Sequence, residues 1–161
     1  MKKILAIVAL IVVLVIPGFS VAATPGACTE SVVRDASSTM VTVTLACTGN
    51  SANGTFPTIT LSDDVMTLLK DKYLLYEVWA FPTPAGTAPD AADVTVNMDG
   101  QDLLGTKGVN LIHATATYDT FPYSSFMSAY RYPLIVNTIT IGIANQATAS
   151  ANLTLRLIFS R

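Results

Sequence analysis

The chain offers few residues for acid–base or nucleophilic chemistry. His113 is its only histidine, and it lies beside Thr115 and Thr117 without an acidic or nucleophilic motif nearby. The sequence has no GxSxG nucleophile elbow, no HExxH zinc motif and no glycine-rich phosphate loop. A solvated histidine on a strand fits this setting better than a catalytic base. We therefore expect a protein that is not an enzyme and has no organic cofactor.

The one concentration of acidic side chains surrounds the dipeptide Asp99-Gly100. Carboxylate oxygens on a tight turn suit Ca²⁺, so Asp99 and Asp102 are the candidate metal ligands. The segment lacks the other ligands of a recognised calcium loop, and Asp-Gly is common because it makes tight hairpin turns. A structural turn is the preferred interpretation, and a calcium site is the alternative.

The two cysteines fit a disulfide. A hairpin turn at residues 37–38 places Val32 opposite Val43. The same register places Cys28 opposite Cys47, which predicts a bridge between them. A redox pair or a metal site would need CxxC spacing or a nearby histidine, and neither is present.

A long aromatic loop is predicted over residues 118–132. Aromatic rings on such a loop can stack on sugars or fill a pocket of a partner protein. We expect Phe121 and Phe126 to cap the open end of the core. The expected contact surface consists of the remaining exposed side chains, Tyr123, Tyr130, Arg131 and Tyr132.

Apolar and polar residues alternate through much of the chain, as in strands that each give one face to a core. The clearest runs, 135–143 and 151–159, predict a closing hairpin around the polar segment 145–150. A short helix is expected after Ser62, with acidic residues in its first turn. Further strands are expected at residues 28–34, 40–47, 56–61, 73–81, 93–98 and 109–118.

These elements predict an all-β fold in a single domain over residues 24–161. We expect an antiparallel β-sandwich, Ig-like or jelly-roll-like, of about seven to nine strands with one short helix. Arg161 follows Phe159 by only two residues. If the final strand borders its sheet, its unpaired backbone groups could accept a strand of another copy.

The N-terminus has the pattern of a secretory signal peptide over residues 1–23. Two lysines precede the apolar run Ile4–Ile16, and small residues end at Ala23. The alternative is an uncleaved membrane anchor, but the run is shorter than the roughly 20 residues of a spanning helix. Removing the segment leaves seven basic and eleven acidic residues, a net charge of −4. That charge argues against nucleic acid as a partner.

From about residue 47 to 159 the order of features resembles small β-sandwich proteins of unknown function found among the structural genes of tailed bacteriophages and prophages. The matching motifs are strand and turn signatures, among them Tyr73–Tyr76, Gly86–Pro89, Asp93–Val96, Asp99–Gly105 and Leu155–Phe159. The resemblance implies a virion-associated or prophage-derived structural protein.

Two functions are consistent with these expectations. The first is an exported structural or surface-contact protein that binds protein partners or copies of itself, at the cell surface, in the periplasm or in a virion. The alternative is a carbohydrate- or ligand-binding module that uses the aromatic loop. Contact with a membrane is expected only through residues 1–23, if they are retained.

Overall fold

The computed structural model describes residues 23–82 and 86–161. The predicted signal peptide lies outside the described residues except for Ala23, so its cleavage stays a prediction. Within the described ranges, no helix is long and apolar enough to cross a membrane.

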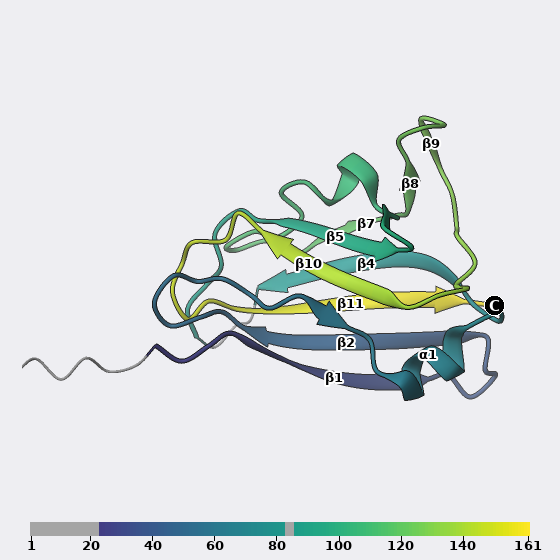
Figure 1. Cartoon of the computed structure of the whole chain (residues 1–161), viewed down its shortest axis with the longest axis horizontal. Coiled ribbons are helices and arrows are strands. Elements are labelled where there is room, and N and C mark those ends of the chain that lie inside the picture. The colour runs from purple at the N-terminus through teal and green to yellow at the C-terminus, as the bar shows by residue number, and fades with distance from the viewer. Residues whose placement is uncertain (1–22, 83–85) are drawn as a thin grey trace, which may run out of the picture.

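The chain forms an antiparallel β-sandwich with one short α-helix, which confirms the predicted fold class (Figure 1). The larger sheet has five strands, in the order β1 (Ala27–Arg34), β2 (Met40–Thr48), β11 (Asn152–Ser160), β4 (Leu74–Pro82) and β7 (Tyr118–Thr120). The smaller sheet has four, in the order β3 (Ile59–Thr60), β10 (Ile139–Ala144), β5 (Asp93–Met98) and β6 (Gln101–Asp102). A separate two-stranded hairpin joins β8 (Tyr123–Ser124) to β9 (Ala129–Tyr130). The helices are α1 (Asp63–Leu69) and the 3₁₀-helix η1 (Gly105–Gly108).

The core lies between the two sheets and is built from alternating residues of their strands. Every second residue of β11 is fully or almost fully buried, as the period of two predicts. Ile139 and Ile141 of β10 face the same core from the smaller sheet. Each such side chain contributes about 1.5–3 kcal/mol of hydrophobic free energy when it is removed from water.

The predicted closing hairpin is wrong. β10 pairs with β3 and β5, whereas β11 pairs with β2 and β4 in the opposite sheet. Asn145 and Ser150 both have positive φ values in the connection, which carries the chain across the core. Strands in facing sheets bury alternate residues in the same way as paired strands, so periodicity cannot identify the partner. β11 is also an interior strand, and the predicted free edge at the C-terminus is therefore wrong.

Two other predicted strands are shortened. The segment expected as a strand at 109–118 is irregular up to Tyr118, where β7 begins. Asn110 turns the chain with a φ of 53°, and only Leu111 and Ile112 reach the core. The strand expected at 56–61 retains ladder pairing only at Ile59 and Thr60.

β1 and β2 form the predicted hairpin, and its register confirms the disulfide. Val32 pairs with Val43, and Cys28 is bonded to Cys47. The turn is held by Asp35, whose carboxylate accepts hydrogen bonds from the Ser37 hydroxyl and the Met40 N–H. These bonds lower the pKa of Asp35 to about 2, so their contribution is lost as the pH falls from about 4 towards 2.

The predicted helix cap is also confirmed, and it links α1 to β1. The Ser62 hydroxyl accepts a hydrogen bond from the Val65 N–H at 3.4 Å. It also donates to the Glu30 carboxylate of β1 at 2.5 Å, and the Ser62 N–H donates to the other Glu30 oxygen at 3.2 Å. β1 buries little apolar surface, so these bonds and the disulfide are its main attachments beyond the ladder with β2.

Removing the disulfide should therefore destabilise the fold. The double substitution of Cys28 and Cys47 by serine is expected to lower the free energy of unfolding by about 3 kcal/mol, because the bridge restricts the unfolded chain. Urea denaturation of the full chain measures this change. Thr29→Ala, at the neighbouring position of β1, is the control and should cost well under half as much. Equal losses in the two variants would contradict this assignment.

Candidate functional site

The hairpin of β8 and β9 projects from one end of the sandwich (Figure 1). Tyr123 pairs with Tyr130, and Ser124 pairs with Ala129. Ser128 closes the four-residue turn with a φ of 50°, and the Met127 N–H donates to the Ser124 hydroxyl at 3.3 Å. Short polar side chains are suited to such a turn because they hydrogen-bond the backbone locally.

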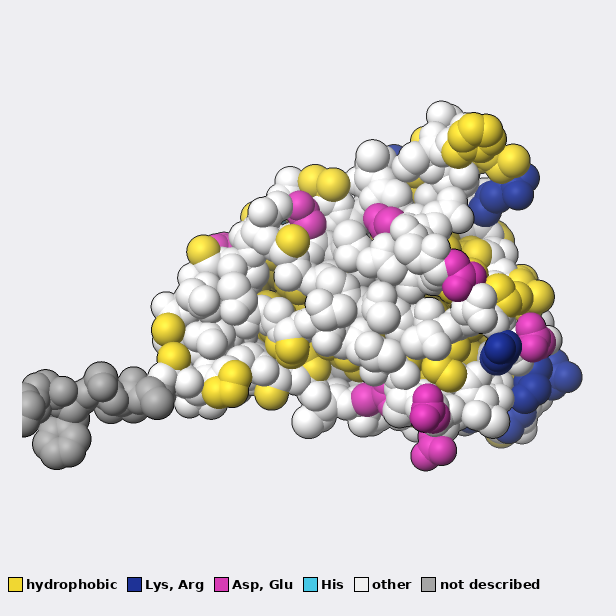
Figure 2. Space-filling model, viewed as in Figure 1, with side chains coloured by type: hydrophobic (Ala, Val, Ile, Leu, Met, Phe, Trp, Pro, Cys, Tyr) yellow, Lys and Arg dark blue, Asp and Glu magenta, His cyan; other side chains and the backbone are white. Residues whose placement is uncertain are grey.

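The end of this hairpin is apolar. Phe126 is 94% exposed and Met127 is 48% exposed. Figure 2 shows hydrophobic side chains gathered at the end of the same projection, with a basic group directly below them. The prediction that Phe126 caps the core is wrong, because the hairpin carries this ring away from the sheets. Phe121, which was expected to cap the core with it, is half-buried at the base of the hairpin.

An aromatic cluster holds the base of the hairpin. Tyr132 stacks on Tyr76 of β4 with ring centroids 5.2 Å apart, and Phe121 meets Tyr76 edge-on at 5.9 Å. Tyr130 meets Tyr123 edge-on at 5.4 Å. Such pairs contribute about 0.5–1.5 kcal/mol each beyond the area that they bury.

A β-bulge in β4 delivers Tyr76 to this cluster. Ile158 of β11 pairs with Glu77, but the next residue, Phe159, pairs with Leu75, so Tyr76 is the extra residue. Leu75 and Val78 both face the core as a result, and Tyr76 is left partly exposed. A bulge redirects a side chain in this way without ending the strand.

Lys107 of η1 completes the base of the hairpin. Its ammonium lies 5.1 Å from the ring centre of Tyr123 and 5.7 Å from that of Tyr130. These distances are within the range of cation–π attraction. Three of the four predicted contact residues therefore have structural partners: Tyr123, Tyr130 and Tyr132 all touch other rings. Arg131 is exposed, and only its backbone N–H is bonded, to the Pro122 carbonyl at 3.0 Å.

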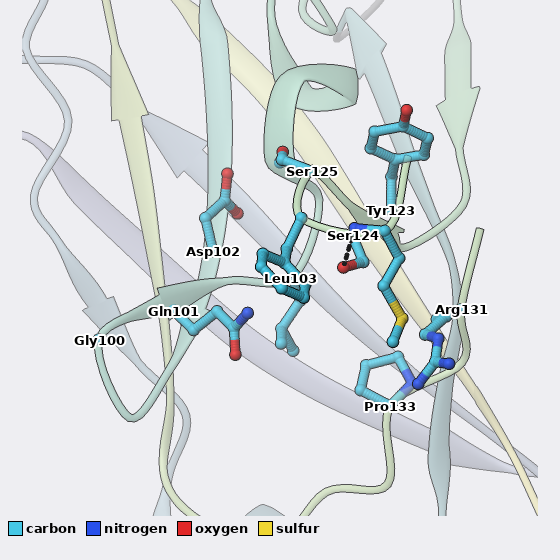
Figure 3. A pocket seen from close by; sticks show the side chains of 12 residues that line it. Gly100, Gln101, Asp102, Leu103, Tyr123, Ser124, Ser125, Arg131 and Pro133 are labelled. Atoms are coloured by element: carbon cyan, nitrogen blue, oxygen red, sulfur yellow. Dashed lines mark hydrogen bonds between the residues drawn. The ribbon is translucent and has the colours of Figure 1, made fainter. Parts of the chain in front are cut away.

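A groove of about 700 Å³ runs between the hairpin and the β5–β6 turn (Figure 3). Gly105 lets the two walls approach closely, because a Cβ there would lie 2.6 Å from the Ser125 hydroxyl oxygen. Its φ of 54° is also a conformation that glycine adopts without strain. The side chains that line the groove include Gln101, Leu103, Tyr123, Phe126, Arg131 and Pro133.

The structure gives the two candidate calcium ligands separate partners. Both oxygens of Asp99 accept hydrogen bonds from the Asn137 amide, at 2.8 and 2.9 Å. Asp102 accepts the backbone N–H groups of Val96 and Leu104, each at 3.1 Å. Burial raises the pKa of Asp102, although its N–H donors favour the ionised form. In the described part of the chain, no three His, Cys, Asp or Glu side chains gather closely enough to hold a metal ion.

The Asp99-Gly100 turn itself is confirmed. Asp99 and Gly100 have φ values of 54° and 77°, and Asn97 pairs with Asp102 across the turn. Two central residues with positive φ are the mark of a type I′ hairpin turn, which matches the twist of the strands.

His113 has local partners only. Its Nδ1 accepts a hydrogen bond from the Thr115 N–H at 3.3 Å, and its ring meets Tyr118 edge-on at 5.5 Å. This segment is irregular, so His113 is not on the predicted strand. The prediction that it is not a catalytic base remains open to a direct test.

Comparison with known proteins adds no relative to this description. No protein-family model matches the sequence, and none of the curated proteins compared with it matches.

The partners of Asp102 predict a structural role that Asp99 does not share. Asp102→Ala should lower the free energy of unfolding by about 1–3 kcal/mol, because two half-buried N–H groups lose their acceptor. Asp99→Ala removes one exposed contact and should cost less than about 1 kcal/mol. Thermal unfolding with and without CaCl₂ measures both effects. A midpoint that rises with calcium in the wild type, and not in either variant, would instead support the calcium site.

Proposed function

We propose that this protein is a non-enzymatic structural protein that assembles through the tip of its β8–β9 hairpin. The observation that carries this proposal is the 94% exposure of Phe126 at the end of the projecting β8–β9 hairpin. Removing a phenylalanine ring from water contributes about 1.5–3 kcal/mol. Aromatic anchors of this kind dominate the binding energy of many protein interfaces.

The base of the hairpin supports this role. The stacked pair Tyr76–Tyr132 and the edge-on pair Tyr76–Phe121 hold the base of the hairpin to β4 before any partner binds. A contact surface that is already ordered loses less conformational entropy on binding. Arg131 lines the same groove as Phe126 and Met127, and Lys107 lies at the base of the hairpin, so basic groups border the apolar tip.

The setting of this assembly is proposed from the sequence. A cleaved signal peptide would place the protein outside the cytoplasm, at a cell surface or in the periplasm. The resemblance to phage and prophage structural proteins supports a second setting, in which the protein assembles as part of a virion. In both settings the hairpin tip contacts neighbouring subunits.

The double variant Phe126→Ser/Met127→Ser tests the hairpin as the assembly surface. The chain, expressed with its own N-terminal segment, is compared with this variant by sedimentation velocity over a range of concentrations. We expect the wild type to self-associate and the variant to associate at least about tenfold more weakly, as for the loss of an interface hot spot.

Met40→Ser is the matched control, because Met40 is similarly exposed at 40% but lies on β2. It should leave self-association unchanged. A wild type that stays monomeric at all concentrations, or equal losses in the hairpin variant and in Met40→Ser, would refute the proposal.

The groove beside the hairpin favours a second candidate function, the binding of a carbohydrate or similar ligand. Its volume of about 700 Å³ lies within the range of ligand sites, and it combines Leu103 and Tyr123 with the polar Gln101 and Arg131. This arrangement offers an aromatic wall and hydrogen-bond donors to a sugar.

A glycan array distinguishes this candidate. If the groove binds sugar, Arg131→Ala should abolish the signal, whereas Arg161→Ala, at the C-terminus, should not. An array without signal, or a signal that Arg131→Ala leaves unchanged, would exclude the groove as the binding site.

A further inference from the structure

β1 is the longest border strand in the described part of the chain. Its eight residues contrast with two or three in β3, β6 and β7, the other border strands of the two packed sheets. Short edges are a common protection against unwanted strand pairing, and β1 lacks it. In Figure 1, β1 lies at the lower border of the larger sheet, with no strand drawn beyond it.

The register with β2 shows which backbone groups of β1 are free. The Asp35 N–H donates to the Met40 carbonyl, so odd-numbered residues of β1 face β2. Cys28 and Cys47 have Cα atoms 4.0 Å apart, as expected for a pair that does not exchange backbone hydrogen bonds. The N–H and carbonyl groups of the even-numbered residues therefore point outward. Among residues 23–82 and 86–161, no strand pairs with them.

The side chains of β1 do not oppose pairing. Val32 is 37% exposed and Val33 is 67% exposed, on opposite faces of the strand. β1 contains no lysine, proline or bulge. Its one acidic residue, Glu30, is already hydrogen-bonded to Ser62. This edge therefore lacks most of the devices that keep border strands apart.

We propose that the outer edge of β1 pairs in antiparallel fashion with β1 of a second copy, joining two five-stranded sheets into one. Because only even-numbered residues point outward, they must form the hydrogen-bonded pairs. One such register places Val32 opposite Val32 of the second copy. It also places Glu30 opposite Arg34 of the second copy, and Arg34 opposite its Glu30.

Charge complementarity favours this register over its neighbour. Opposite charges directly across two strands are stabilising, and the two-fold symmetry creates the pair twice. Asp63 and Asp64 follow Ser62, which contacts Glu30, so the acidic end of this edge is reinforced by α1. The neighbouring register, with Ser31 opposite Ser31, would set Arg34 against Cys28 and Glu30 against Val32, without an ion pair.

This dimer is independent of the hairpin tip, since β1 and the β8–β9 hairpin belong to different sheets. The proposed dimer is a two-fold symmetric contact between two copies of the chain. Strand pairing by another protein, or by the N-terminal segment of the same chain, would use the same groups.

Cysteine cross-linking tests the edge and its register. In the full chain with its own N-terminal segment, Val32→Cys should form an intermolecular 32–32 disulfide, found by non-reducing gel and peptide mass mapping. Ser31→Cys is the register control and should not cross-link. A link through residue 31, or no link through residue 32, would overturn the proposed pairing.

Charge reversal gives a second, independent measurement. Arg34→Glu replaces each of the two proposed Glu30–Arg34 ion pairs by two opposed acidic side chains. It should weaken dimerisation about tenfold in sedimentation velocity. Lys70→Glu, at the residue that follows α1, changes the net charge equally and should have no effect. A protein that stays monomeric, or a dimer insensitive to Arg34→Glu, contradicts the proposal.

Amide hydrogen exchange separates the second copy from the other occupants. The N–H groups of Glu30, Val32 and Arg34 should gain protection as the protein concentration rises. Protection in a monomer would assign the edge to the N-terminal segment and overturn the dimer. The Phe126→Ser/Met127→Ser variant should retain the Val32→Cys cross-link, so failure of the hairpin proposal and failure of this one can be distinguished.

Discussion

The structure depends on the double ladder of β11. This last strand of the chain pairs with β2 on one side and β4 on the other, and every second side chain from Leu153 to Phe159 is fully or almost fully buried. β1 is attached through β2, and β7 through β4, so the whole larger sheet is organised around it. Its partners lie far away in sequence, and the sheet therefore cannot form until most of the chain is available.

The same ladder positions the candidate contact surface. Its one irregularity, the bulge opposite Ile158 and Phe159, takes Tyr76 out of the core alternation and into contact with Tyr132 and Phe121. The hairpin is thus held by a side chain from the central part of the sheet, although its own strands are only two residues long. An isolated hairpin of that length would be marginal in water. The aromatic cluster therefore fixes the base of this projecting hairpin.

Much of the fold could be predicted from the sequence, because local signals specify it. The Cys28–Cys47 register, the Ser62 cap and the Asp99-Gly100 turn each depend on residues close together in the chain. The separate partners of β10 and β11 could not be predicted, since burial in facing sheets produces the same alternation as a hairpin. The bulge at Tyr76 left no sequence signal. Small polar residues such as those on either side of Phe126-Met127 are typical of turns, but a large apolar ring is usually buried, so Phe126 was expected in the core.

The two proposals give the sandwich two separate contact elements, the hairpin tip and the β1 edge. A two-fold contact at one and a further contact at the other would allow assemblies larger than a dimer. The most direct test is a concentration series of ¹H–¹⁵N spectra of the full chain. We expect the amide signals that shift with concentration to be those of residues 125–128 and 30–34. Shifts confined to the outer faces of the sheets, or no shifts at any concentration, would contradict both proposals.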